Sequence, residues 1–126
     1  MKSSLNSSPQ SLREVAERAR AGSSLDLALR NFLDEFYFRP RLEMLLEEPP
    51  PTGQSIGDCY LAATADELGS QFFQRVPRWA QKPERHLPEP WFGFQSPLGR
   101  AYALIFTPSA FRERNLFIGE DALKRA

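Results

Sequence analysis

Two side chains in this sequence could act as a catalytic acid, base or nucleophile: His86 and Cys59, the only histidine and the only cysteine. His86 lies in a proline-rich stretch, residues 83–88, which predicts a surface position without the partner groups that a catalytic histidine needs. A helix N-terminus lowers a thiol pKa, but Cys59 precedes Tyr60 and Leu61 on a predicted core helix. We therefore favour a structural role for both, and a small enzyme that uses one of them is the catalytic alternative.

The acidic residues do not form an acid–base pair by their spacing. Asp34–Glu35 and Glu47–Glu48 are adjacent, and neighbours on a helix point about 100° apart. The sequence contains no nucleotide-binding glycine loop, zinc motif or nucleophile elbow. One histidine and one cysteine are also too few for a typical zinc site. We therefore expect no catalytic residues, no metal and no cofactor, and a protein that is not an enzyme.

The C-terminal third offers better candidates for binding than for catalysis. Residues 86–94 read HLPEPWFGF, where prolines hold an extended backbone that carries three large aromatic side chains. Two arginines follow beside another aromatic residue and could meet the phosphates or carboxylates of a partner. The predicted partner-binding residues are Trp91, Phe92, Phe94, Arg112 and Arg114. Core packing is the favoured alternative for Trp91 and Phe92, and a solvated salt-bridge surface is the alternative for the arginines.

The composition limits the function classes. Sixteen basic and sixteen acidic residues give a formal net charge of zero, which disfavours non-specific nucleic-acid binding. No apolar run approaches the roughly 18 residues of a membrane helix, and the polar N-terminus does not read as a signal peptide. We expect a cytoplasmic protein that does not bind membranes.

The elements that position these residues are predicted to be helices. Apolar residues recur at helical spacing along most of the 126-residue chain. The expected fold is all-α: five to seven short helices with proline-rich connections, and a minor β pairing that could involve residues 116–118. The expected organisation is a flexible N-terminus, residues 1–8, and a single helical domain, residues 9–126.

Several boundaries follow from capping residues and prolines. Ser8 and Pro9 predict the start of the first helix, Ser23 or Ser24 that of the second, and Asp58 that of the third main helix. Residues 98–106 form an apolar run whose length fits a buried helix or a buried strand. Pro97 at its start favours the helix.

Six segments occur in a recognisable order along the chain. They are FLDEFY at residues 32–37, DCYLAA at 58–63, PRW at 77–79, PWF at 90–92, TPSAFRERN at 107–115 and LFI at 116–118. In this order the chain resembles a family of small bacterial proteins encoded beside nucleotidyltransferase-fold proteins in proposed toxin–antitoxin pairs. The resemblance covers residues 25–126 and includes no catalytic signature.

The resemblance implies an antitoxin-like protein that binds and neutralises a neighbouring toxin of the nucleotidyltransferase class. Some relatives carry a helix-turn-helix segment in front of this domain, and the 24 residues that precede the resemblance here are too few for a three-helix DNA-binding domain. A nucleic-acid-binding transcriptional regulator or accessory factor is the alternative function.

Overall fold

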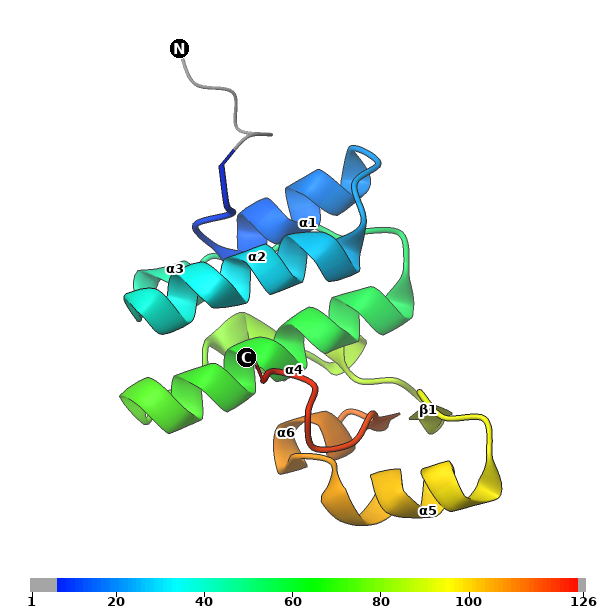
Figure 1. The fold of residues 1–126 in the computed structure, drawn as a ribbon. Coiled ribbons are helices and arrows are strands. Elements are labelled where there is room, and N and C mark those ends of the chain that lie inside the picture. Colours follow the sequence, from blue (N-terminus) through cyan, green and yellow to red (C-terminus); the bar gives the residue numbers. More distant parts are fainter. Residues whose placement is uncertain (1–6, 125–126) are drawn as a thin grey trace.

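The structure, a computed structural model, describes residues 7–124 and is mostly helical (Figure 1). Its elements are α1 (Leu12–Arg20), α2 (Leu25–Phe38), α3 (Glu43–Leu46), α4 (Ser55–Phe73), the 3-10 segments η2 (Arg78–Gln81) and η3 (Pro83–Arg85), β1 (Trp91–Phe92), α5 (Pro97–Phe106), α6 (Ser109–Arg112) and β2 (Leu116–Phe117). The predicted all-α fold with a minor β pairing is confirmed. Of the expected flexible N-terminus, residues 1–6 lie outside the described part.

Helix α4 lies between two groups of elements. Helices α1 and α2 cover one side of it, and η2, η3, α6 and the two strands lie on the other (Figure 1). Its buried residues are mostly small, including Ala62, Ala63 and Ala65, so neighbouring elements approach it closely. One hydrophobic cluster extends from Leu12 in α1 to Leu123 near the C-terminus, and both groups contribute to it.

The N-terminal helices begin at serine caps. Helix α1 begins after Ser11, whose hydroxyl accepts a hydrogen bond from the Glu14 backbone N–H, and not after Ser8 as predicted. Helix α2 begins after Ser24, whose hydroxyl accepts from Leu27 N, as one of the two predicted caps. Each cap satisfies a backbone donor that the first turn leaves free.

Asp58 is not the cap of the third main helix. Helix α4 already begins at Ser55, so Asp58 lies within its first turn. There the Oδ1 atom of Asp58 accepts hydrogen bonds from the backbone N–H and the hydroxyl of Thr52, at 2.9 and 2.8 Å. The side chain therefore ties the preceding loop to the helix, a role that the sequence pattern does not distinguish from capping.

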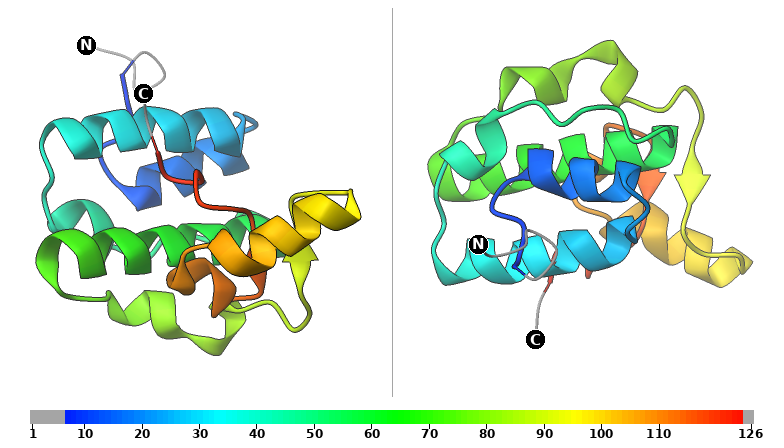
Figure 2. Two further views of the ribbon diagram at one scale, coloured as in Figure 1. Left: turned by 60° about the horizontal axis from the view of Figure 1, so that its bottom comes forward. Right: turned by 90° about the horizontal axis from the view of Figure 1, so that it is seen from above.

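The two strands form a short parallel pair. Trp91 is opposite Leu116 and Phe92 opposite Phe117. Trp91 N donates to Asn115 O at 2.8 Å, and Gly93 N donates to Phe117 O at 3.0 Å. This pairing joins the proline-rich connector to the C-terminal segment. The connection between the strands contains α5 and α6, and α5 lies at the edge of the molecule (Figure 2).

Within residues 7–124, none of the helices has the length and apolar character needed to cross a bilayer.

Candidate protein-binding surface

The five predicted binding residues do not share one surface. Trp91 is 37% exposed, Phe92 and Phe94 are half-buried, and Arg112 is exposed on α6. Arg114, two residues further on, is only 1% exposed. The structure therefore separates a set that sequence spacing had placed together.

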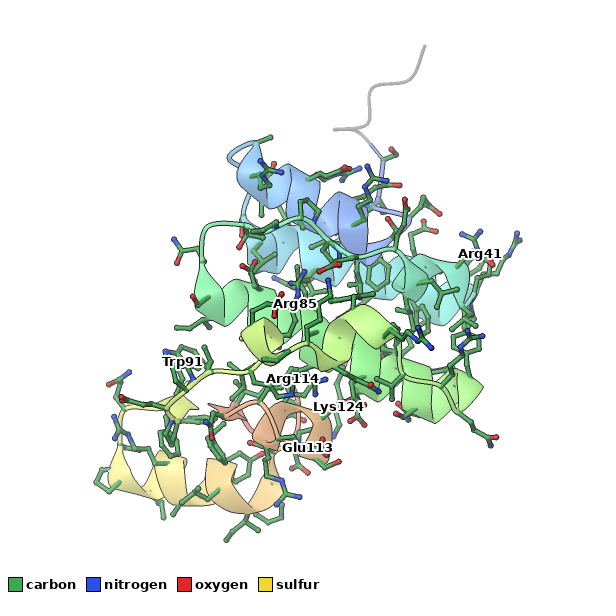
Figure 3. All side chains as sticks on the ribbon, turned by 180° about the vertical axis from the view of Figure 1, so that it is seen from behind. Arg41, Arg85, Trp91, Glu113, Arg114 and Lys124 are labelled. Carbon is green, nitrogen blue, oxygen red and sulfur yellow. The ribbon has the colours of Figure 1, made fainter. Side chains whose placement is uncertain are left out.

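Arg114 is a core residue, and the expectation that it contacts a partner is wrong. Its Nη1 atom donates to Asp66 Oδ2 and to Ala110 O, both at 2.8 Å, and Nη2 donates to Ala80 O at 2.7 Å. The guanidinium thus connects α4, α6 and η2 inside the molecule (Figure 3). An arginine can serve this many acceptors because its donors form a rigid planar fork.

Phe92 and Phe94 hold α5 in place more than they present a surface. Phe92 stacks on Phe117 with ring centroids 5.1 Å apart, and the Arg100 guanidinium lies 5.2 Å from the Phe92 ring centroid. Phe94 packs its ring against the edge of Tyr102 of α5 at 5.8 Å. These contacts fit the core-packing alternative for Phe92.

Trp91 lies on the other face of the strand pair. Successive residues of a strand point to opposite sides, so Phe92 faces α5 and Trp91 does not. Figure 3 shows the Trp91 side chain directed away from α5. Trp91 is 37% exposed and does not belong to the hydrophobic core cluster.

The most exposed large apolar side chains of the C-terminal half are on α5, and they were not among the residues predicted to bind a partner. The α5 outer face consists of Leu98, Ala101, Leu104 and Ile105. Leu98 is 82% exposed, Ile105 67% and Leu104 50%. At 3.6 residues per turn these positions share one side of the helix.

The expectation that the run 98–106 is buried is therefore wrong, although the helix itself is confirmed. Only Ala103 of α5 is fully buried. A helix that is apolar on all sides normally lies inside a protein. Here the chain has no further described element to cover the outer face. In the sequence, the feature that could have indicated this face is the helical spacing of Leu98, Ala101 and Ile105, on the side opposite Ala103.

Both ends of α5 are fixed by hydrogen bonds. At the start, the Ser96 hydroxyl accepts from Gly99 N at 3.0 Å, and Pro97 occupies the first helical turn as predicted. At the end, the buried Thr107 hydroxyl donates to Ala103 O at 2.6 Å and accepts from Ile118 N and Gly119 N at 3.0 and 2.8 Å. Thr107 thus joins the end of α5 to the segment that follows β2.

The inner side of α5 packs against the C-terminal segment. Gly119 lies so close to Tyr102 that an added Cβ would be 2.9 Å from its ring, and its φ of +84° favours glycine. The Tyr102 hydroxyl donates to Glu120 Oε1 at 3.3 Å. The helix is therefore rigidly placed, with its apolar outer face turned to solvent.

Cys59 and His86, the two candidates for catalysis, each lie close to a backbone carbonyl. Cys59 is buried, its thiol lies 3.8 Å from Glu84 O, and burial raises its thiol pKa. The Nδ1 atom of His86 lies 2.9 Å from Lys82 O. Over residues 7–124, no three histidine, cysteine or carboxylate side chains are close enough to hold a metal ion.

A separate groove of about 740 Å³ lies away from the α5 outer face. Three carboxylates line it, those of Asp34, Glu67 and Glu120, together with the exposed aromatic residues Tyr37 and Phe38. Burial, followed by the neighbouring Asp66, raises the pKa of Glu67. Lys124 also lines the groove, and its ammonium group lies 3.2 Å from Asp121 Oδ1.

Comparison with protein-family models, curated proteins and solved structures finds no match for this chain.

Proposed function

We propose that this chain is a non-catalytic binding protein of the cytoplasm that neutralises a neighbouring toxin, one with a nucleotidyltransferase fold. The observation that carries the binding role is the α5 outer face, where Leu98 and Ile105 are mostly exposed on a rigidly held helix. Clustered exposed apolar side chains are characteristic of interaction sites. The identity of the partner comes from the resemblance of residues 25–126 to antitoxin-like proteins.

The proposed mechanism is occlusion of the toxin. A preformed apolar surface docks beside the toxin's active-site cleft and blocks access of its substrate. Arg112, which is exposed on α6, is the remaining predicted polar contact for a charged cleft. Arg114 has no part in this mechanism because it is buried.

The nucleic-acid-binding alternative has less support. A basic surface for nucleic acid in this region would need Arg100, Arg112 and Arg114, but Arg114 is buried and paired with Asp66. Arg100 lies over the Phe92 ring and donates to Phe94 O. The net charge of zero also disfavours this alternative. Nucleic-acid binding that weakens steeply with added salt would favour it.

The test is co-expression of this chain with the protein encoded next to it, followed by purification through a tag on one of them. We expect a stable complex and restored growth of cells in which the neighbour alone is toxic. A neighbour that neither binds this chain nor is neutralised by it would contradict the proposal. Nucleic-acid binding at several salt concentrations would then be measured.

A further inference from the structure

We propose that the groove of about 740 Å³ binds a linear aliphatic polyamine, a flexible hydrocarbon chain that carries two or more ammonium groups. We call it the acidic groove, after the carboxylates of Asp34, Glu67 and Glu120 that line it. It is a small-molecule site separate from the α5 outer face, and it does not depend on the proposed function.

Two helices form the walls of the acidic groove. Asp34, Tyr37 and Phe38 lie three and four positions apart on α2, so they share one side of that helix. Glu67 and Gln71 are four positions apart on α4 and likewise share one side. Each helix therefore turns a carboxylate into the same groove, and α2 adds two aromatic rings.

The C-terminal segment forms the third side. The Tyr37 hydroxyl donates to Leu123 O at 2.8 Å, and Figure 1 shows this segment, in red, reaching α4 and α2. The Tyr37 ring also lies 5.9 Å from the ring of Phe72 on α4. These contacts hold the three sides together, so the groove is largely formed before a ligand enters and binding requires little ordering of the protein.

The charge of the acidic groove selects a cation. Its lining has three carboxylates and one ammonium group, that of Lys124. This ammonium group already lies 3.2 Å from Asp121 Oδ1. A ligand with several positive charges is therefore complementary to the lining.

Glu67 is the carboxylate that gains most from a cationic ligand. It is half-buried, and burial, followed by the charge of Asp66, raises its pKa. Asp66 has its own cation, because Arg114 Nη1 lies 2.8 Å from Asp66 Oδ2. A perturbed carboxylate in a cleft is a candidate binding group, and a ligand ammonium would give Glu67 a charge-assisted hydrogen bond.

The arrangement favours an extended organic cation over a compact one. The three carboxylates come from separate elements and are too far apart to hold one metal ion together. Phe38 is 80% exposed and Tyr37 37% exposed, and aromatic faces attract ammonium groups. Two rings are too few for the aromatic cage of a quaternary ammonium. A chain of methylene groups between ammonium groups can contact the rings and reach more than one carboxylate.

The test measures spermidine binding to the whole chain by isothermal titration calorimetry at low salt. Glu67→Gln removes the half-buried charge, and Phe38→Leu removes the most exposed ring. The matched controls are Glu89→Gln and Phe106→Leu, which make the same changes at exposed residues outside the acidic groove. Because burial disfavours the charged form of Glu67, we expect Glu67→Gln to fold, and circular dichroism checks this.

We expect saturable one-to-one binding to the wild type. Glu67→Gln should weaken it about tenfold or more, because a hydrogen bond between charged groups is lost. Phe38→Leu should weaken it about threefold, and both controls should bind within about twofold of the wild type. In a carboxyl-carbon NMR titration, spermidine should lower the pKa of Glu67, since a cation beside a carboxylate favours its charged form.

Several results would overturn the proposal. One is a wild type that does not bind spermidine, and another is equal binding by Glu67→Gln and Glu89→Gln. Putrescine has the same charge as Mg²⁺, so displacement of putrescine by an equal concentration of Mg²⁺ would show general attraction to acidic surface. Tighter binding of a short peptide with two lysines than of spermidine would assign the groove to lysine side chains of a protein. None of these results bears on the complex with the neighbouring protein, which is tested separately.

Discussion

At the residue scale, Arg112 and Arg114 show how two identical side chains two positions apart take opposite roles. Helix α6 ends at Arg112, and the chain then turns so that Arg114 points inward to three acceptors from three elements. A buried guanidinium is tolerated when it is paired and hydrogen-bonded. Arg114 therefore stabilises the fold, whereas Arg112 is a surface residue.

The Arg114→Met variant should be strongly destabilised. It leaves Asp66 without its ion-pair partner and the carbonyls of Ala80 and Ala110 without their donors. We expect a loss of about 3 kcal/mol in the free energy of unfolding, measured by urea denaturation. Arg112→Met is the matched control and should change stability by less than about 0.5 kcal/mol. Equal effects of the two substitutions would contradict the different roles assigned here.

We expect the ionisation of Tyr60 to lower the free energy of unfolding at alkaline pH. Burial, followed by the charge of Asp26, raises the pKa of its hydroxyl to about 12. The unfolded chain ionises near pH 10. Because the folded state holds this proton more tightly, the stabilising contribution is complete below about pH 10 and is lost as the pH rises toward 12.

Absorbance at 295 nm should show a tyrosine that titrates near pH 12. In urea denaturation, Tyr60→Phe should lose less stability between pH 10 and 12 than the wild type. It should not abolish that loss, because burial also raises the pKa of Tyr37. An identical pH dependence in the wild type and in Tyr60→Phe would show that Tyr60 ionises normally in the folded protein.

At the element scale, the position of α5 depends on one hydroxyl group. Thr107 makes three hydrogen bonds and is 2% exposed, although it belongs to a connection between two helices. It satisfies two backbone N–H groups after β2 that would otherwise be buried without an acceptor. The same group therefore stabilises the C-terminal segment and sets the direction of the α5 outer face.

The Thr107→Val variant keeps the shape of the side chain and removes the hydroxyl. Ile118 N and Gly119 N then lack their acceptor, so we expect a loss of about 1–3 kcal/mol in the free energy of unfolding. Hydrogen exchange should speed up in residues 97–106 and 118–119 before it does in α4. Ser109→Ala, an exposed residue nearby, is the control and should have little effect. Unchanged exchange in α5 would contradict this anchoring role.

At the scale of the whole molecule, a few polar contacts join the N-terminal helices to the C-terminal elements. The indole N–H of Trp79 in η2 donates to Leu45 O of α3 at 2.9 Å. Arg85 in η3 donates to Asp58 O and Pro49 O, and its guanidinium lies 4.9 Å from the Trp79 ring centroid. Together with the shared hydrophobic cluster, these contacts make the two groups of elements interdependent.

We therefore expect one cooperative unfolding transition. In the Trp91→Phe variant, Trp79 is the one remaining tryptophan, so tryptophan fluorescence reports on the junction between the two groups. Its fluorescence and the far-ultraviolet circular dichroism should give the same midpoint in urea, as a two-state protein requires. Separate midpoints would show that the α1–α3 group unfolds independently of the rest.

Much of the fold could be predicted from the sequence because helix signals are local. The cap at Ser24 and the helix start at Pro97 depend on neighbours within a few positions, and the structure agrees with both predictions. Asp58 and Ser8 were assigned incorrectly because each has the residue type of a cap, and only the folded loop decides which residue takes that role.

The candidate site was harder to predict because exposure is a property of the whole fold. The sequence by itself determined the helical character of residues 97–106 and the presence of aromatic side chains near residue 91. Only the tertiary structure decided that Arg114 is buried, that Phe92 supports α5, and that Leu98 and Ile105 face solvent. The physical reason is that burial depends on which distant segments pack on each face, and α4, η2 and β2 come together only when the chain folds.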